Sequence, residues 1–327
     1  MKKATSKKKA TSKPRAAAEK LGFIGLGVMG EPMCRNLAKR SRRPVLAFDL
    51  RPAPLKRLAA DGVVRAGSVS ELAASADVIF LSLPGETEVA AVGRELAYFS
   101  HGGQAIVDCS TAPVSLAREL ARAFGNRGAQ FADAPVARTR QAAIDGTLSI
   151  MVGAEPALFR RIEPLLRCMA SDVTHCGPVG AGQAVKLLNN MVLSESIVAL
   201  AEALAVAKAS GAVDPKVLFE TLAKGSADSF ALRNHGMKAL LPEKHPEHAF
   251  PVTYMLKDLA YAMELARGAG LELAGAGTAK KLLEETAKLG LGEKYHTALI
   301  EAVRKRRAPS AGDEPSAVRR GAGTRRR

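Results

Sequence analysis

The chain has few cysteines, no N-terminal apolar segment and no long uninterrupted apolar run. Four cysteines in 327 residues are too few to form a disulfide framework, which indicates an intracellular protein with free thiols. The first 20 residues lack the apolar region of a secretory signal. Residues 191–209 are rich in apolar side chains, but Ser194, Glu195, Glu202 and Lys208 interrupt them, which favours a buried helix over a membrane span. We therefore expect a soluble, cytoplasmic protein.

The net charge of +16 comes mostly from the two ends of the chain. Both ends are basic and poor in large apolar residues, so burial cannot offset the entropy lost on ordering them. We expect disordered basic tails at residues 1–19 and 307–327. Such tails can bind polyanions in a salt-dependent way, although a solvated tail without function is the favoured interpretation. No helix-turn-helix signal or interleaved aromatic residues accompany them.

Short apolar runs rich in branched residues recur from Leu21 onward, each bounded by Gly, Pro or Asp, as is typical of buried parallel strands. Amphipathic stretches at 28–41, 113–124 and 156–169 lie between some of them. This alternation predicts an α/β fold with a doubly wound, Rossmann-type parallel sheet. The expected strands are 21–25, 44–49, 77–84, 104–109, 130–136 and 148–153.

The strand signal stops after Cys176, and an uninterrupted helical pattern covers about residues 183–210. Gly211 is the expected C-cap of this helix, and Asp214-Pro215 is expected to start the next one. The second part of the chain is therefore predicted to be an all-helical C-terminal domain. Its further expected helices are 214–224, 252–268, 275–289 and 295–306.

A GxGxxG motif follows the first expected strand and opens the first expected helix. Its glycines allow a tight turn and the approach of a backbone to a pyrophosphate at the helix N-terminus. Asp49 ends the next strand at the spacing where an acidic side chain holds the adenosine ribose, and its charge favours NAD over NADP. Arg51 leaves NADP open as an alternative. The motif residues are Gly25, Leu26, Gly27, Val28, Met29 and Gly30.

Two polar segments follow later strands, at the carboxyl edge where open α/β sheets bind ligands. Ser110 and Thr111 come after the strand at 104–109, and Asp133 comes near the end of the strand at 130–136. The hydroxyls of Ser110 and Thr111 are suited to a carboxylate or to the nicotinamide ribose. Capping of the helix that begins near residue 113 explains them equally well.

Lys186, Asn189 and Asn190 lie on the long predicted helix. Lys186 and Asn190 are four residues apart and share a face, which Asn189 flanks. A lysine with two amides is unusual among such apolar neighbours unless the face lines a polar cleft. A desolvated ammonium exchanges its proton more readily near neutral pH, which suits general acid/base catalysis. A solvent-facing lysine is the alternative.

Five motifs, in order and spacing, resemble the β-hydroxyacid dehydrogenase family, which includes 3-hydroxyisobutyrate dehydrogenase, tartronate semialdehyde reductase and sulfolactaldehyde reductase. The resemblance covers about residues 20–300 and leaves both tails outside. The motifs are GFIGLGVMG (22–30), DCSTAP (108–113), DAPV with GTLSIMVG (133–136 and 146–153), GAGQAVKLLNN (180–190) and LKDLAYA (256–262).

The resemblance implies roles for individual residues. Lys186 is the expected general acid/base, and Asn190 is expected to orient the substrate. Ser110 and Asn189 are similar to positions that hold the anionic group of the substrate. The residues expected to contact the nicotinamide cofactor are Leu83, Pro84, Thr111 and Lys257. The resemblance also implies an NAD-binding domain over residues 20–180 and a helical domain for substrate binding and dimerisation over 181–306.

One departure from the family pattern concerns the loop after DAPV, where many members have Ser-Gly-Gly and this chain has Ala137-Arg138-Thr139. An arginine can pair bidentately with a carboxylate or a sulfonate, and Arg138-Thr139 resembles the sulfolactaldehyde reductase branch. Leu193 stands where that branch tends to have a serine. The alternative is that Arg138 points to solvent and the backbone alone binds the acid group.

We expect an NAD-dependent oxidoreductase that interconverts a small anionic β-hydroxyacid and its semialdehyde, as in 3-hydroxyisobutyrate dehydrogenase. The substrate is expected between the two domains, and relatives form homodimers or homotetramers. Reduction of a sulfolactaldehyde or tartronate semialdehyde substrate is one alternative; a non-catalytic, nucleic-acid-associated factor on the same fold is another. No metal is expected, because His245 and His248 have no acidic or thiol partner at ligand spacing.

Overall fold

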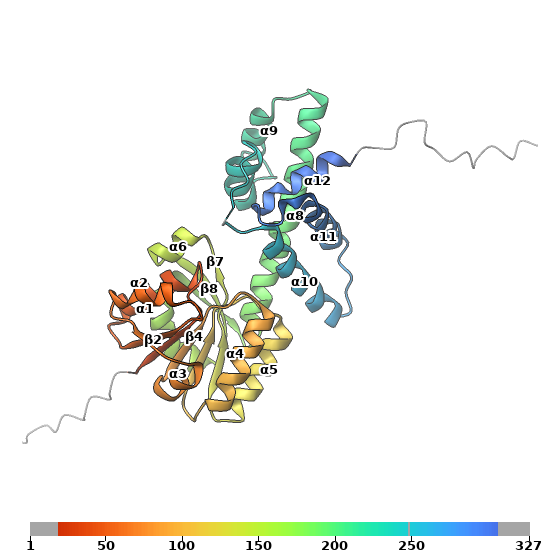
Figure 1. The fold of residues 1–327 in the computed structure, drawn as a ribbon. Helices are drawn as coiled ribbons and strands as arrows, with labels where there is room; N and C mark the ends of the chain where they lie inside the picture. Colours follow the sequence, from red (N-terminus) through yellow and green to blue (C-terminus); the bar gives the residue numbers. More distant parts are fainter. Residues whose placement is uncertain (1–18, 248, 307–327) are drawn as a thin grey trace, which may run out of the picture. The chain divides into compact units, whose positions relative to one another are not determined.

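The computed structural model describes residues 19–247 and 249–306. Except for Glu19, the predicted tails at 1–19 and 307–327 lie outside these ranges. The chain divides into two compact units, and the boundary between them falls inside one helix, after Leu187. Residues up to Leu187 form the α/β unit, and residues from Leu188 form the helical unit (Figure 1). Glu19, which the prediction placed in the N-terminal tail, is among the described residues and forms ion pairs with Arg43 and Arg161.

The α/β unit contains one nine-stranded sheet in the order β3-β2-β1-β4-β5-β6-β8-β7, with β9 paired to β8. Its elements are β1 (Leu21–Ile24), α1 (Gly30–Ser41), β2 (Val45–Phe48), α2 (Pro52–Ala59), β3 (Val64–Arg65), α3 (Val69–Ser75), β4 (Val78–Leu81), α4 (Glu86–Phe99), β5 (Ala105–Asp108), α5 (Val114–Gly125), β6 (Gln130–Asp133), β7 (Val136–Ala137), α6 (Arg140–Asp145), β8 (Leu148–Gly153), α7 (Pro156–Leu166) and β9 (Ala170–Gly177).

The sheet is covered on both faces, because successive side chains of a strand point in opposite directions. Val78 and Phe80 of β4 pack in one core cluster with side chains of α1, α2 and α7. Ile79 and Leu81 of the same strand pack in the other cluster with side chains of α3, α4 and α5. The prediction of a doubly wound, Rossmann-type layer is confirmed.

The sheet departs from the all-parallel arrangement expected for the predicted strands. Strands β1 to β6 are paired in parallel, but β8 runs antiparallel to β6 and β7. The expected strand at 130–136 is split into β6 and β7 around Pro135, which has no N–H for a ladder bond. Strands β3 and β9 were not predicted; most of their side chains are at least partly exposed, so they lack the apolar runs of the buried strands.

The helical unit follows along α8 (Ala181–Ser210), and the prediction of a helical C-terminal part is confirmed. Gly211 adopts φ +64° after this helix, and the Asp214 carboxylate caps the next one by accepting bonds from Lys216 N and Val217 N. The remaining elements are α9 (Pro215–Leu222), the π-helix η1 (Leu232–Leu240), α10 (Val252–Gly268), α11 (Ala274–Thr286), the π-turn η2 (Ala287–Leu291), the 3₁₀ turn η3 (His296–Leu299) and α12 (Ile300–Lys305).

Helix α8 is long and apolar enough to cross a membrane by length and composition. A core helix of a soluble protein passes the same test, and 44% of its most apolar window is buried inside the protein. Its side chains Ile197, Ala201 and Leu204 are fully buried in the core of the helical unit. These contacts give α8 the packing of a core helix.

Candidate functional site

Of the three motif glycines between β1 and α1, only the middle one has open space where a Cβ would lie. Gly25 has φ +90°, and a Cβ there would overlap the carbonyl oxygen of Ser82. A Cβ at Gly30 would overlap the carbonyl oxygen of Gly25. At Gly27, by contrast, no heavy atom of the described residues lies within 4 Å of where a Cβ would be. The outer glycines therefore shape the turn, and the middle one leaves it open.

The start of α1 is suited to bind an anion. Its N-cap residue Met29 makes no side-chain capping bond, and Val28 beside it is 59% exposed. The first N–H groups of a helix have no partner within the helix and carry partial positive charge. A helix start that has no side-chain cap, behind an open glycine, fits the pyrophosphate of a dinucleotide.

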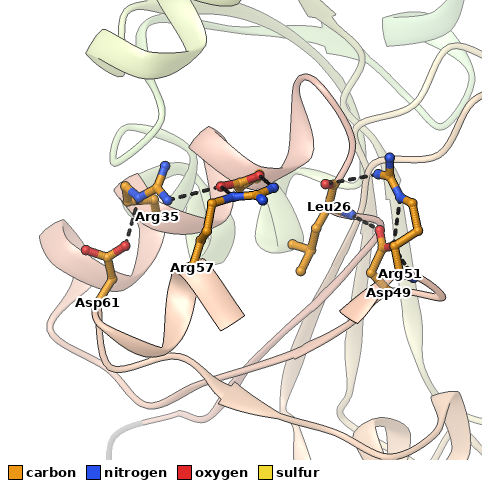
Figure 2. A network of polar contacts seen from close by, with 7 residues as sticks. Leu26, Arg35, Asp49, Arg51, Arg57 and Asp61 are labelled. Atoms are coloured by element: carbon orange, nitrogen blue, oxygen red, sulfur yellow. Dashed lines mark hydrogen bonds and ion pairs between the residues drawn. The ribbon is translucent and has the colours of Figure 1, made fainter. Parts of the chain in front are cut away.

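Asp49 lies directly behind this loop, and Figure 2 shows its contacts. Its Oδ2 accepts a 2.6 Å bond from Leu26 N, so the carboxylate holds the glycine loop. Its Oδ1 accepts bonds from Arg51 N at 2.8 Å and Arg51 Nε at 3.4 Å. The side chain of Arg51 is 67% exposed, and its Nη2 donates to Leu26 O at 3.4 Å. The two residues predicted to bear on the choice between NAD and NADP, Asp49 and Arg51, are thus in contact.

A second set of charges joins α1 to α2 (Figure 2). Glu31 accepts two bonds from the Arg57 guanidinium at 2.8 and 2.6 Å, and one from Arg35 at 3.1 Å. These arginines hold the pKa of the Glu31 carboxyl below its usual value, the bond from Arg57 contributing most. Arg35 also pairs with Asp61 at 2.7 Å. The network ties the helix that begins at the glycine loop to the helix that follows Arg51.

The loops after β4 and β5 are joined through Ser110, which is buried. Its Oγ accepts a 2.9 Å bond from Leu83 N, and its own N–H donates to Asp108 Oδ1 at 2.9 Å. The N-cap of α5 is Pro113, without a side-chain capping bond, so Ser110 does not cap that helix. Thr111 is half-buried in the same loop and Pro84 is exposed. The structure therefore brings together the predicted residues Leu83, Ser110 and Thr111.

Helix α8 begins at the carboxyl end of β6. The Asp133 carboxylate is fully buried and accepts bonds from Gly180 N at 2.6 Å and Gln183 N at 2.7 Å. Burial raises the pKa of Asp133 to about 6, against the effect of these two N–H groups. Lys186 lies one turn further along α8 and is 9% exposed. A nearly buried lysine thus follows a helix start that is anchored at the sheet edge.

Sequence reasoning missed the part played by Gln183 in the α/β unit. Its side chain is fully buried and bonds to the loop that carries Ser110 and Thr111. In the printed sequence it is one polar residue in the motif GAGQAVK, and nothing local to it indicates these partners. The two bonds span 71 and 73 positions along the chain.

In the helical unit, Asn190 is held by a buried acid. Its Nδ2 donates to Asp258 Oδ2 at 2.6 Å, and its Oδ1 accepts from Asn189 Nδ2 at 3.0 Å. Asp258 is 2% exposed, and Lys257 Nζ lies 3.4 Å from its Oδ1. The Lys257 ammonium also lies over the rings of Tyr254 and Tyr261. Asp258 is a second residue that the sequence did not single out, although its neighbour Lys257 was predicted.

The Arg138 guanidinium has partners other than the expected acid group. It donates to Asp172 Oδ2 at 2.5 Å, to Ser171 Oγ at 2.7 Å and to Thr147 O at 2.6 Å. Its backbone has φ +84°, a left-handed conformation that side chains rarely adopt. Thr139 caps α6 by accepting from Ala142 N. The Arg138 guanidinium is thus paired with the Asp172 carboxylate, and its contact with the acid group of a substrate stays a prediction.

Within residues 19–247 and 249–306, no group of three or more His, Cys, Asp and Glu side chains is placed to hold a metal ion. His245 instead pairs its Nδ1 with Thr297 Oγ1 at 2.8 Å. His248 lies outside the described residues.

Comparison with known families covers almost the whole described chain. Residues 20–177 match a family model described as the NAD binding domain of 6-phosphogluconate dehydrogenase. Residues 180–303 match a model described as NAD-binding of NADP-dependent 3-hydroxyisobutyrate dehydrogenase. The first match contains the glycine loop and Asp133, and the second contains Lys186 and Lys257.

Individual relatives align over most of both chains. A 2-(hydroxymethyl)glutarate dehydrogenase of Eubacterium barkeri is 35% identical, over 86% of this chain and 94% of its own. A 2-hydroxy-3-oxopropionate reductase of Escherichia coli is 32% identical, over 87% and 97%. The solved structure of a Mycobacterium tuberculosis 3-hydroxyisobutyrate dehydrogenase with L-serine is 30% identical, over 88% and 99%, with a TM-score of 0.82.

Proposed function

The chain belongs to the β-hydroxyacid dehydrogenase family, and from this premise we propose that Lys186 transfers the proton when a small anionic β-hydroxyacid and its semialdehyde are interconverted. The family membership makes the protein an NAD(P)-dependent oxidoreductase acting on a hydroxyl group. A bound nicotinamide supplies the acceptor or donor of the hydride. Proton transfer and the placing of the substrate are left to side chains of the protein.

The observation that carries the proposal is a nearly buried lysine one turn beyond an anchored helix start. Lys186 is 9% exposed, and the first turn of α8 is bonded to Asp133 and to the Ser110 loop. In the oxidative direction Lys186 Nζ takes the hydroxyl proton, and in the reductive direction it returns it. Asn190, fixed by Asp258, orients the substrate. Ser110 and Asn189 are proposed to hold the anionic group.

Substitution of Lys186 tests this role. Lys186→Ala should lower kcat by about 10² to 10⁴-fold, the usual range for general acid/base catalysis, while cofactor affinity stays nearly unchanged. Lys208→Ala is the matched control, because Lys208 lies in the last turn of the same helix and pairs with Glu243. Steady-state rates and cofactor titration measure both effects. A Lys186→Ala enzyme with more than about a tenth of wild-type kcat would contradict general acid/base catalysis by this residue.

For the cofactor, we propose that NAD is preferred over NADP. The Asp49 carboxylate, bonded to Leu26 N, repels a 2′-phosphate, whereas Arg51 attracts one. Asp49→Asn should therefore narrow the ratio of kcat/KM between NAD and NADP, and Arg51→Ala should widen it. Higher kcat/KM with NADP in the wild type would show that Arg51 dominates.

We propose a homodimer or homotetramer, formed through the helical unit. Large apolar side chains are exposed there, including Phe230 at 71%, Val206 at 65% and Leu271 at 58%. Light scattering at micromolar concentration measures the assembly, and a monomer would contradict it. We also propose a cytoplasmic location. The basic tails, on which the nucleic-acid alternative rests, lie outside the described residues.

A further inference from the structure

Gln183 is fully buried, and both ends of its side-chain amide are bonded. Its Nε2 donates to Ser110 O at 2.8 Å, and its Oε1 accepts from Ala112 N at 3.2 Å. The amide thus joins the first turn of α8 to the loop after β5 by bonds on either side of Thr111. Replacing either end would leave a buried backbone group of this loop without its partner.

The backbone around Gln183 is also hydrogen-bonded and closely packed. Gln183 N and Gly180 N both donate to the Asp133 carboxylate. The preceding residue, Gly182, has no room for a Cβ, which would overlap Met151 O and lie 2.9 Å from Gly153 N. The first turn of α8 is therefore seated against the ends of β6 and β8.

The bonded chain extends to the loop after β4, because Ser110 Oγ accepts from Leu83 N at 2.9 Å. The loops after β4 and β5 and the start of α8 thus form one connected set. Lys186 follows Gln183 by three residues, about one helical turn. A shift of Gln183 relative to the Ser110 loop would move the start of the helix that carries Lys186.

We propose that Gln183 is a positioning residue, which sets the place of Lys186 relative to the loop of Ser110 and Thr111 without touching the substrate. The proposal rests on the proposed role of Lys186. Reacting groups tolerate little misplacement, since an error of about 1 Å can lower a rate by about 10²-fold. Loss of the amide should therefore affect kcat more than the affinity for the cofactor, whose phosphate site lies at the glycine loop.

A second buried glutamine, Gln104, is a matched control for Gln183, because it lies at the opposite, amino end of β5. Gln104 is 1% exposed, and its Nε2 donates to Ala73 O at 2.8 Å and to Ala76 O at 2.7 Å. It directly precedes β5, whereas the Ser110 loop follows that strand. Both side chains hold backbone groups in the interior of the α/β unit. Gln183 alone of the two is bonded to the loop of Ser110 and Thr111.

The experiment compares Gln183→Met with Gln104→Met in the full-length protein. Both variants lose buried hydrogen bonds and should have a lower Tm by circular dichroism. Gln183→Met should lower kcat by about 10 to 100-fold with the KM for the cofactor within about threefold, as expected for misplaced reacting groups. Gln104→Met should keep kcat within about twofold.

A third variant, Gln183→Glu, tests rescue. A protonated carboxyl group offers one donor and one acceptor, which are the two roles that the Gln183 amide fills here. The kcat of Gln183→Glu, relative to wild type at the same pH, should therefore rise as the pH falls. The corresponding ratio for Gln183→Met should stay flat. If Gln183→Met does not fold, Gln183→Glu carries the test alone.

Wild-type kcat in Gln183→Met, an equal loss of kcat in Gln104→Met, or a flat pH ratio in Gln183→Glu would each overturn the positioning role. Failure of the proposed function itself has a different signature. In that case Lys186→Ala retains turnover, whatever the glutamine variants do.

Discussion

Asp133 in the α/β unit and His296 in the helical unit are both buried, but burial shifts their pKa values in opposite directions. Asp133 is fully buried against Gly180 N and Gln183 N, and its pKa is raised to about 6. His296 is 1% exposed, its Nδ1 lies 3.1 Å from Phe250 O, and burial lowers its pKa to about 3. Among the residues that the structure describes, His296 Nε2 finds no hydrogen-bond partner.

The surroundings explain why the two groups differ. His296 lies among the rings of His235, Phe250 and Tyr295, and it stays neutral because that environment solvates a cation poorly. Asp133 faces two N–H groups at the start of the helix that carries Lys186, where a carboxylate is the better acceptor. Its charge opposes stability at neutral pH, yet it anchors the proposed site. In the helical unit, the buried His296 ring thus packs in the core. In the α/β unit, the buried Asp133 carboxylate holds the start of α8 in place.

The largest expected effect of this difference is a loss of stability in acid caused by His296. The pKa of its imidazole is 6.5 in the unfolded chain and about 3 in the folded protein. The stability that depends on the neutral ring is therefore present above pH 6.5 and is lost as the pH falls toward 3. The full span corresponds to about 5 kcal/mol.

His296→Asn should remove that part of the pH dependence, measured as the unfolding free energy in urea between pH 7 and pH 4. His101→Asn, at an exposed position of the α/β unit, is the matched control and should leave the slope unchanged. An unchanged slope in His296→Asn would show that this ring does not cause the acid sensitivity.

Asp133 should give a smaller effect of opposite sign. Its pKa is 3.8 when unfolded and about 6 when folded. Its contribution to stability is therefore fully present below pH 3.8 and is lost as the pH rises through 6. The span is about 3 kcal/mol. The unfolding free energy of wild type minus that of Asp133→Asn should fall by this amount between pH 4 and pH 7. A constant difference would mean that the carboxyl group titrates alike in both states.

The fold was predictable where one element carries its own signal. The period of the long helix α8, the glycine after it and the Asp-Pro start of α9 are local features, and all three predictions are confirmed. Strand direction is different, because it depends on the connection and not on the strand. Parallel neighbours need a crossover of about a dozen residues or more, and the link from β7 to β8 is shorter. Strand β8 therefore runs antiparallel.

The candidate site was predictable for residues inside motifs and not for the contacts between motifs. Lys186 and Ser110 are found from their segments alone. Asp258 reaches Asn190 across 68 positions, so its partner cannot be read locally. Ser171 and Asp172, two partners of Arg138, lie in β9, a mostly exposed strand that has no buried apolar run. The sequence therefore does not indicate the ion pair with Asp172, and the contact of Arg138 with the substrate stays a prediction.

The smallest expected effect concerns Arg138, whose charge is paired at the surface of the α/β unit and does not depend on burial. A side chain at φ +84° is strained by about 1 to 3 kcal/mol, and solvent screens an exposed ion pair such as that with Asp172, so the pair offsets little of this strain. Arg138→Gly loses the pair but relieves the strain, so its Tm should stay close to wild type. Arg138→Ala loses the pair and keeps the strain, so its Tm should be lower.

If Arg138 only shapes the loop, Arg138→Gly should also retain kcat/KM for the acid within about threefold, well below the tenfold change that 1.4 kcal/mol produces. If the guanidinium instead leaves Asp172 to bind the acid group, both variants should lose kcat/KM by at least tenfold, whatever their Tm.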